Sequence, residues 1–463
     1  MRGARVLAGW ACVAVASARA GTPVPSQSAP DVLTLGDVLT AVDAAHPLME
    51  AVRLRARVAE GERVAAEGAL DPALKAKVQA KPGTWDSQSV SLGVPLRAWG
   101  GELTGAWSRG AGTFEPWQGE LETDGATELS VAASLPLLRD SWIDRRRMTR
   151  DRATHELDVA EADVRVRALE LRRAAAARYW DWVAAGARVR VAERLLALAE
   201  ARDVALAVQV DLGDVPAIVR EDSRRLVLER TDRRIQARRA LEQARIELSL
   251  HLRDAEGRRV LAPDALLPAT LQAPADAIVP EDARDVALRE RPELVRLRAQ
   301  REQAALDVRL QGNQRLPALD LVGEHARTLS TDTPSWKVGA QADWTLGART
   351  ARGRLDAAQA VLRRVDADLR FATDRIEADV LDAISAVEAA RARVAFSEQL
   401  VAVAQRVAEA EAARFALGDS NLIFVNQREI ASAEAELQVI DARLAACKGW
   451  VDVLAAEGVL APP

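Results

Sequence analysis

The residue types that most often perform catalysis or bind metals are few in this sequence and lie far apart. The histidines are His46, His155, His251 and His325. None of them has a cysteine or carboxylate partner at the spacing of a metal motif. The sequence also lacks a phosphate-binding loop, a nucleophile elbow and a dinucleotide-binding glycine motif. We therefore expect no catalytic residues, no cofactor and no metal site, and hence no enzyme.

The composition of the chain excludes further classes of protein. The 463 residues include 63 Lys+Arg and 68 Asp+Glu, a formal net charge of −5. This balance argues against a nucleic-acid partner. Abundant Ala, Leu, Arg and Glu favour helix, and no run of about 18 apolar residues predicts a transmembrane helix. Bulk composition alone therefore indicates a soluble helical protein.

The first residues have the pattern of a secretory signal peptide. Arg2 and Arg5 precede an apolar run, and Ala18-Arg19-Ala20 forms a cleavage site. Residues 1–20 are therefore not expected to be part of the folded protein. Residues 21–33 are proline-rich and predict an extended lead. Lipidation of Cys12 stays open, although Trp10 fits a lipoprotein signal poorly.

The rest of the chain repeats itself. Pro47 and Pro72 recur as Pro292 and Pro317, at an offset of 245, and Leu-Gly-Asp at 212–214 recurs at 417–419. Four markers in the same order in both halves indicate a duplication. We assign residues 34–252 to the first repeat, 253–280 to a proline-rich connector, 281–458 to the second repeat, and 459–463 to a tail.

Each repeat contains one very long helix. Glycine and proline are absent between Gly353 and Gly418 and nearly absent between Pro136 and Gly213, and apolar residues recur every three or four positions. Each stretch therefore predicts a helix of about 65 residues, near 100 Å long. Shorter helices are expected over 34–70, 215–252, 282–315 and 422–457. Two short helices stacked end to end match the length of one long helix. The Leu-Gly-Asp sequences are expected at the tight turns where a long helix reverses into a short one.

Two inserts, residues 74–137 and 318–346, alternate polar and apolar residues instead. This alternation predicts strands with one lipid face and one lumen face. Each insert leaves and returns to the same helical end and so holds an even number of strands. We expect two in each, about four per chain, with a loop around residues 110–125. Four strands in the first insert stay an alternative, and so does a small soluble sheet.

Tryptophans concentrate in or beside these inserts, and this distribution favours a membrane, because tryptophan prefers membrane interfaces. The expected interface residues are Trp85, Trp99, Trp107, Trp117, Trp142, Trp336 and Trp344. Four strands cannot close a barrel, and an open sheet edge is not tolerated in lipid. Strands that span a membrane therefore require several copies of the chain.

This layout resembles the TolC family of outer-membrane efflux proteins over essentially the whole mature chain. The most similar stretches are residues 135–139 (Leu-Pro-Leu-Leu-Arg), 287–294 (Ala-Leu-Arg-Glu-Arg-Pro-Glu-Leu) and 414–419 (Arg-Phe-Ala-Leu-Gly-Asp). The resemblance implies a mainly α fold with a small β part. It also implies a homotrimer with one shared twelve-stranded barrel in the outer membrane of a Gram-negative bacterium, and a periplasmic helical tunnel. A periplasmic adaptor and an inner-membrane pump are the implied partners.

The resemblance also assigns roles to residues at the helical tips. The adaptor-docking positions are Leu212, Gly213, Asp214, Leu417, Gly418 and Asp419. TolC itself gates with carboxylates shortly after the tip glycine. The corresponding positions here are Val219, Asp222, Phe424 and Gln427. The gate is therefore expected to be partly apolar. Asp214 and Asp419 are expected chiefly to cap the following helices, with acidic rings as the alternative.

Two other functions fit parts of this pattern. A periplasmic coiled-coil adaptor also has long helical hairpins, but it needs β-rich domains flanking one hairpin rather than a duplicated hairpin with internal strands. A structural helical protein without channel activity needs no membrane strands. The exported substrate, the class of pump and the gating mechanism are not encoded in any motif of the chain.

Overall fold

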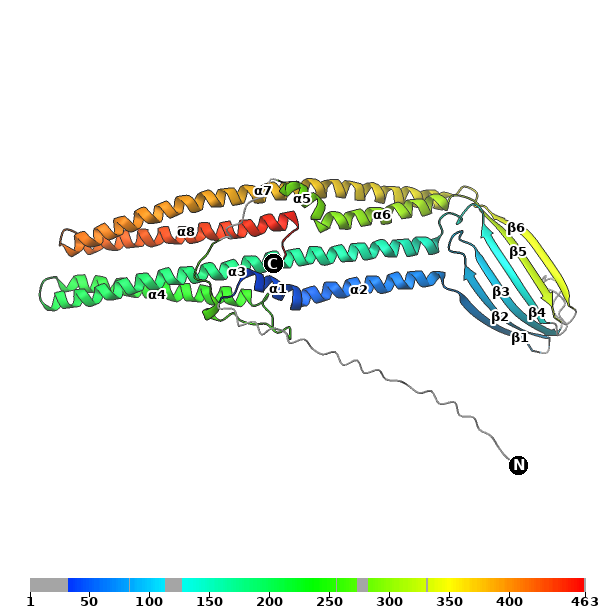
Figure 1. Ribbon diagram of the computed structural model, residues 1–463, viewed down its shortest axis with the longest axis horizontal. Helices are drawn as coiled ribbons and strands as arrows, with labels where there is room; N and C mark the ends of the chain where they lie inside the picture. Colours follow the sequence, from blue (N-terminus) through cyan, green and yellow to red (C-terminus); the bar gives the residue numbers. More distant parts are fainter. Residues whose placement is uncertain are drawn as a thin grey trace, which may run out of the picture.

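The computed structural model describes residues 32–82, 84–112, 127–254, 256–272, 282–329 and 332–461. The molecule is elongated, with its helices along the long axis and one sheet at the end (Figure 1). The predicted signal peptide and Cys12 lie outside the described residues. The α-helices are α1 (Leu35–Ala45), α2 (Pro47–Glu67), α3 (Arg145–Asp211), α4 (Ala217–Leu248), α5 (Ala283–Glu290), α6 (Pro292–Asn313), α7 (Arg349–Ala416) and α8 (Leu422–Glu457).

The two long helices are confirmed. Helix α3 has 67 residues and α7 has 68. Helices α2 and α4 pack end to end along α3, and α6 and α8 do the same along α7. Contacts between α3 and α6 and between α3 and α8 join the two halves. The helices therefore form a single curved layer, in the order α2–α3–α6–α7 near the sheet and α4–α3–α8–α7 at the far end.

Two of the predicted short helices are broken by proline. The segment expected as one helix over 34–70 divides at His46, and the segment over 282–315 divides at Arg291. Each of these residues is extended because it precedes a proline, which starts the next helix at its first position. Prolines 47 and 292 are equivalent in the two repeats, so both halves carry the same bend near the middle of the molecule.

The sheet has more strands than expected. The strands are β1 (Ala73–Lys81), β2 (Trp85–Pro95), β3 (Glu102–Gly112), β4 (Thr127–Pro136), β5 (Ala318–Thr328) and β6 (Thr333–Asp343). All neighbours are antiparallel, and the order is β1-β2-β3-β4-β5-β6.

The expectation of about four strands is therefore wrong, and the first insert holds four by itself. A tight turn at Gly100-Gly101, where Leu96 N donates to the Gly101 carbonyl, separates β2 from β3. The predicted loop over residues 110–125 starts too early, because β3 continues to Gly112. The remainder of that loop, with Trp117, lies outside the described residues.

One arginine fastens the sheet to the long helix. Arg147, in the first turn of α3, pairs with the N-cap residue Asp144 at 2.6 Å. Its guanidinium also donates to the carbonyls of Ala98, Asp140 and Ser141. These charge-assisted hydrogen bonds connect the β2–β3 turn, the exit of β4 and the start of α3. The sheet is therefore held in a defined orientation on the helices.

The main apolar core lies near the middle of the molecule, where both repeats meet. Trp182 and Val183 of α3 pack there with Leu248 of α4 and Cys447 of α8, all fully buried. The connector covers this region, and Leu267 seats directly against Gly186 of α3, where a Cβ would come within 2.3 Å of a Leu267 methyl carbon. Among the described residues, no helix is both long and apolar enough to cross a membrane.

Two histidines meet at this midpoint and make stability depend on pH. His46 stacks on His251, with ring centroids 5.8 Å apart. Burial lowers the pKa of His251 to about 4, assisted by the charges of His46, Arg178 and Arg253. Burial also lowers the pKa of His46.

We expect this pair to destabilise the folded chain in acid. At His251 the unfolded chain binds the proton near pH 6.5 and the folded chain only near pH 4, so stability falls as the pH drops between these values, and the lowered pKa of His46 acts in the same direction. After a discount for partial exposure, the loss at His251 is about 1–3 kcal/mol. Urea unfolding of wild type and His251→Gln at pH 7 and pH 4.5 checks this. An equal loss in both proteins would contradict it.

Candidate functional site

The register of the sheet separates its side chains into two chemically different faces. One face is mainly polar, and its polar members include Lys75, Lys77, Gln79, Lys81, Ser87, Ser89, Ser91, Glu102, Thr104, Ser108, Glu128, Ser130, Ser134, Asp320, Glu324, Thr328, Ser335, Lys337, Gln341 and Asp343. The opposite face is mainly apolar, and its larger apolar members are Leu74, Val78, Val90, Leu92, Val94, Leu103, Trp107, Leu129, Val131, Leu135, Leu319, Leu321, Trp336 and Val338. We call these the polar face and the apolar face.

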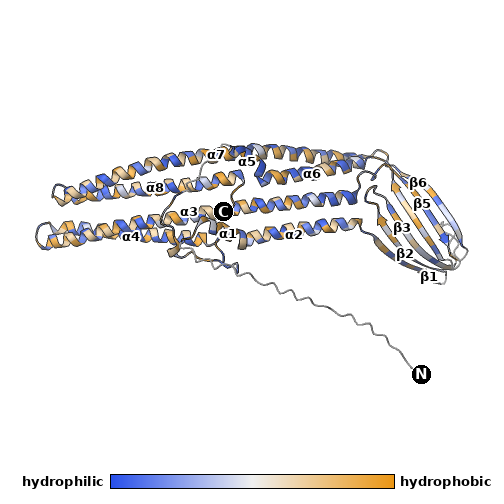
Figure 2. Ribbon diagram, viewed as in Figure 1, coloured by the Kyte–Doolittle hydropathy of each residue, from blue (hydrophilic) through white to orange (hydrophobic). Residues whose placement is uncertain are grey.

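The apolar face is exposed in the single chain and has the dimensions of a membrane band. Val338 is 79% exposed and Val78 is 76% exposed. The strands have 9 to 11 residues, the length at which a tilted strand crosses a bilayer. Polar and apolar residues interleave along the strands (Figure 2), so an average over the sequence conceals the apolar face.

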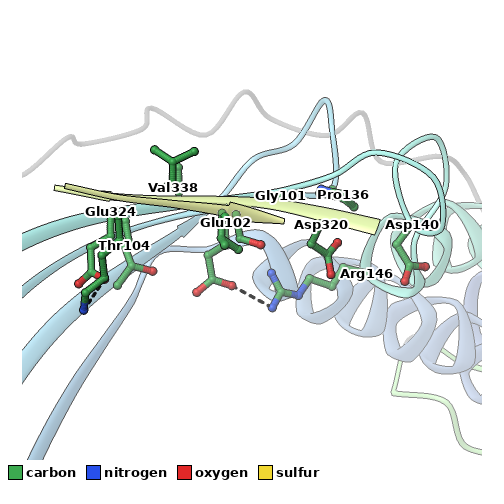
Figure 3. Close-up of a pocket in the computed structure, with 17 residues that line it drawn as sticks. Gly101, Glu102, Thr104, Pro136, Asp140, Arg146, Asp320, Glu324 and Val338 are labelled. Atoms are coloured by element: carbon green, nitrogen blue, oxygen red, sulfur yellow. Dashed lines mark hydrogen bonds and ion pairs between the residues drawn. The ribbon is translucent and has the colours of Figure 1, made fainter. Parts of the chain in front are cut away.

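A cavity of about 630 Å³ lies on the polar face, where the sheet meets the helices. Figure 3 shows Glu102, Thr104 and Glu324 on this side of the sheet and Val338 on the other. Arg146 pairs with Glu102 at 3.3 Å, and Lys337 pairs with Glu324 at 3.7 Å. The cavity is therefore an open surface with charged side chains at the base of the sheet, and its chemistry suits an aqueous passage.

The polar face also carries a group of cations that sequence reasoning did not single out. Of the five lysines in the chain, Lys75, Lys77 and Lys81 lie on the polar face of β1, and Lys337 lies on the polar face of β6. The signal in the sequence is the even spacing of positions 75, 77 and 81. Even spacing puts strand residues on one face.

The predicted interface tryptophans lie at different levels of the sheet. Trp99, Trp142 and Trp344 are 67%, 87% and 68% exposed. Trp142 and Trp344 stand in the segments that join strands to helices, and Trp99 stands in the turn between β2 and β3. Trp107 and Trp336 lie on the apolar face, whereas Trp85 lies on the polar face. The first three therefore expose their indole rings, and their role at a membrane–water boundary stays a prediction.

The helical tips have the open geometry expected of tight turns. Gly213 and Gly418 have φ of +82° and +78°, and each lies in open space. Glycine is favoured there because a Cβ is strained in this conformation. Leu212 and Leu417 are 71% and 85% exposed. The tips therefore present apolar side chains to solvent at the end of the molecule farthest from the sheet (Figure 1).

The expected capping role of the two tip aspartates is wrong. Helix α4 has Pro216 at its N-cap with no side-chain hydrogen bond, and α8 is capped by Asn421, whose side chain accepts from Phe424 N. Asp419 instead accepts from Arg414 at 3.3 Å. The N-cap residues of both helices lie two residues after the aspartates, so neither Asp214 nor Asp419 occupies the N-cap position.

The four gate candidates lie within the first turns of α4 and α8. Phe424 is 51% exposed, Gln427 and Asp222 are exposed, and Val219 is half-buried. Asp222 is 3.8 Å from Arg225 of its own helix. Phe424 and Gln427 are separated by three residues and hence lie on one side of α8.

A buried ion-pair cluster near the tips was not predicted. Glu429 of α8 accepts hydrogen bonds from Arg202 of α3 and, at 2.7 Å, from Arg230 of α4. Arg230 is 2% exposed and also donates to the Leu195 carbonyl. Burial alone would raise the pKa of Glu429, but the two arginines outweigh it and hold the pKa below its usual value. The partners are too far apart in sequence for any local motif to reveal them.

The structure describes no cluster of three or more metal-ligating side chains within the ranges given above. A two-faced sheet of membrane-spanning length on a layer of long helices is the architecture of an outer-membrane channel subunit. The comparisons with known proteins agree with this class. Residues 283–458 match the family described as outer membrane efflux protein.

The chain therefore carries an outer membrane efflux protein domain, and the resemblance to the TolC-like efflux channels is confirmed. The predicted location, in the outer membrane with a large periplasmic portion, is confirmed with it. A search of curated proteins finds no match.

Solved channels share the whole fold. The outer-membrane channel OprN is 16% identical, with a TM-score of 0.69 over 93% of this chain and 91% of its own. The MtrE outer membrane channel of Neisseria gonorrhoeae is 18% identical, with a TM-score of 0.69 over 95% and 94%. VceC of Vibrio cholerae is 15% identical, with a TM-score of 0.65 over 92% and 96%. At these identities the similarity concerns the fold.

Proposed function

We propose that this protein is the outer-membrane exit channel of a tripartite efflux or secretion system and acts as a homotrimer. In this proposal it is a passive conduit, coupled to an inner-membrane pump through a periplasmic adaptor. The observation that carries the proposal is the separation of the sheet into a polar face and an exposed apolar face. An apolar face fits lipid, and the opposite face with its ion pairs fits a water-filled lumen.

The exposed surface supports association of several copies. The chain exposes 29232 Å², whereas a compact monomer of this length is expected to expose roughly 17,000 Å². Exposed apolar side chains lie on both sides of the helical layer. On α7 the exposed residues Phe396, Leu400, Val403 and Val407 follow the spacing of a coiled-coil seam. On α4, at the opposite side, Leu228 and Ile235 are 70% and 56% exposed.

A cell fractionation experiment separates this proposal from its alternatives. We expect the full-length protein to remain with outer membranes after carbonate washing, to require detergent for extraction, and to form pores in planar bilayers. A periplasmic adaptor or a structural helical protein is not expected to form pores. Release of the protein by carbonate would contradict the proposal.

The helical tips are proposed as the adaptor-docking surface. Because Leu212 and Leu417 are largely exposed, replacing both by serine is expected to leave thermal stability within about 0.5 kcal/mol of wild type. We expect in-cell cross-linking to the adaptor to fall at least about tenfold, because a change of 1.4 kcal/mol in binding is tenfold. Unchanged cross-linking would exclude the tips as the docking surface. The exposed pair Leu54 and Val58 of α2, replaced in the same way, is the control.

Phe424 is proposed as part of a periplasmic gate together with Val219, Asp222 and Gln427. In a ring of three copies, three half-exposed phenylalanines at one level form an apolar constriction that resists wetting. We therefore expect Phe424→Ala to raise the open probability of single channels in planar bilayers, with Phe371→Ala, far from the tip on α7, as the control. An open probability equal to wild type would remove Phe424 from the gate.

A further inference from the structure

The two outer strands of the sheet end in edges that nothing in the described part of the chain covers. Strand β1 pairs with β2, and β6 pairs with β5. In lipid, an open edge leaves backbone donors and acceptors without partners, at several kcal/mol for each group. Strand β1 runs away from the helices and β6 runs back toward them (Figure 1), so copies placed side by side bring antiparallel edges together.

We propose that β1 of each copy pairs with β6 of the next, so that three copies close an 18-stranded barrel with Gln79 opposite Lys337. The inference rests on the proposed trimer and concerns how its barrel is built. It replaces the twelve strands implied by the family resemblance, because the described part of each chain supplies six strands.

The stagger of the sheet is that of a closed barrel. One row of facing residues crosses the whole sheet and consists of Ala73, Gly93, Thr104, Ala132, Glu324 and Lys337. The row starts at the first residue of β1 and ends six residues before the last residue of β6. Six residues of rise over five strand spacings correspond to a tilt of about 40°. Closed barrels have tilts of about 35–45°. The sheet therefore already has the slope of a barrel segment.

The width of the six-stranded sheet also agrees with the width of the helical layer. Six strands, about 4.8 Å apart and tilted by about 35–40°, occupy roughly 36 Å of circumference. Four helices packed at 8–10 Å occupy roughly 32–40 Å. A ring of copies therefore closes the sheet and the helical layer at nearly the same radius. With 18 strands, the barrel is roughly 34 Å across between backbones, about one and a half times the diameter of a 12-stranded one.

Side-chain chemistry selects the register between copies. Lys337 lies on the polar face, so its polar partner on β1 is Lys75, Lys77, Gln79 or Lys81. Each of the three lysines would set two cations directly opposite each other, which is unfavourable. The Lys77 register also lowers the tilt to about 25°, below that of closed barrels. The Gln79 register pairs all of β1 with residues 335–343, inside β6.

The apolar face agrees with this choice. With Gln79 opposite Lys337, Val78 faces Val338, and Ala80 faces Trp336. A small residue opposite the large indole accommodates it, and the two valines form a β-branched pair. All four side chains lie on the apolar face, so the band continues across the boundary between copies.

Disulfide cross-linking tests the pairing and its register. Facing residues in antiparallel strands have Cα atoms about 4.5–5.5 Å apart, within the range of a disulfide. Gln79→Cys with Lys337→Cys is compared with Lys77→Cys and with Lys81→Cys, each combined with Lys337→Cys. The native Cys447 is fully buried, and burial raises the pKa of its thiol to about 12. It therefore stays unreactive during oxidation.

We expect oxidation of outer membranes to yield dimers and trimers, and no larger species, from the 79/337 variant, at least about tenfold faster than from the other two. Native mass measurement in detergent runs in parallel. Trimers that cross-link at none of the three pairs would overturn the strand pairing and leave the channel proposal intact. Faster cross-linking at 77/337 or 81/337 would overturn the register. Monomers in the wild type would overturn the trimer itself.

Discussion

Replacing Glu429 by alanine is expected to cost about 3–5 kcal/mol of folding stability, because it leaves a charge buried without its partner. Arg230 has a side chain that is only 3% exposed and lies 2.7 Å from the Glu429 carboxylate. Arg202 loses the same acceptor, although it keeps its hydrogen bond to the side-chain oxygen of Asn426 at 2.9 Å. We expect α8 to detach from α3 and α4 at the tip before the rest of the molecule unfolds.

The measurement is urea unfolding in detergent, together with hydrogen exchange of the amides in the first turns of α8. Glu229→Ala is the matched control, because its partner Arg225 has a side chain that is 62% exposed. Exposed pairs contribute about 0–1 kcal/mol. A loss at Glu429 no larger than at Glu229 would show that the buried cluster does not hold the two hairpins together.

The second large effect is expected on the apolar face of the sheet. Val131 lies in the middle of β4 on the apolar face, and its neighbour Ala132 lies on the polar face opposite Glu324. Arginine at the bilayer midplane of a barrel costs about 2–4 kcal/mol per copy. We therefore expect Val131→Arg to abolish assembly in the outer membrane.

Ala132→Arg is the matched control for this substitution. It inserts the same side chain one position along the same strand, into the lumen and beside a carboxylate, so we expect assembly as in wild type. The measurement is the amount of heat-modifiable, membrane-inserted oligomer on gels. Normal assembly of Val131→Arg combined with loss of assembly in Ala132→Arg would reverse the assignment of the two faces.

The helical part of the fold was predictable because its signals are local. Without glycine or proline, the segments before Gly213 and Gly418 have few alternatives to helix, and α3 and α7 end where those glycines begin the turns. The bends at Pro47 and Pro292 were equally visible in the sequence. They were overlooked because the periodicity of apolar residues continues across each proline, although the backbone before it becomes extended.

The number of strands was harder to predict, because alternation shows that strands exist without showing where they reverse. The turn at Gly100-Gly101 has no Asn-Gly or Asp-Gly signature of a short hairpin, so β2 and β3 were not separated. The contacts that need tertiary structure were beyond sequence reasoning altogether. His46 and His251, or Arg202 and Glu429, meet only because the two stacked short helices bring distant segments together.

The functional surfaces also divide into those with a local sequence signal and those that depend on tertiary structure. The exposed tips were predictable from turn chemistry, since a tight turn depends on residues close in sequence. The capping of α4 and α8 was not, because Pro216 and Asn421 start these helices later than the aspartates suggested. The chemistry of the polar face became apparent only when the register of the strands was known.

The single-layer design has a genetic consequence. In the proposed trimer, the single helical layer and the open sheet edges of each copy are completed by its neighbours, so one defective copy impairs the whole ring. If a variant that still assembles but conducts poorly is synthesised in equal amount with the wild type and mixes freely, only about one eighth of threefold rings contain three normal copies. Defects in this protein are therefore expected to be dominant over the normal allele, whereas defects in a monomeric transporter are expected to be recessive.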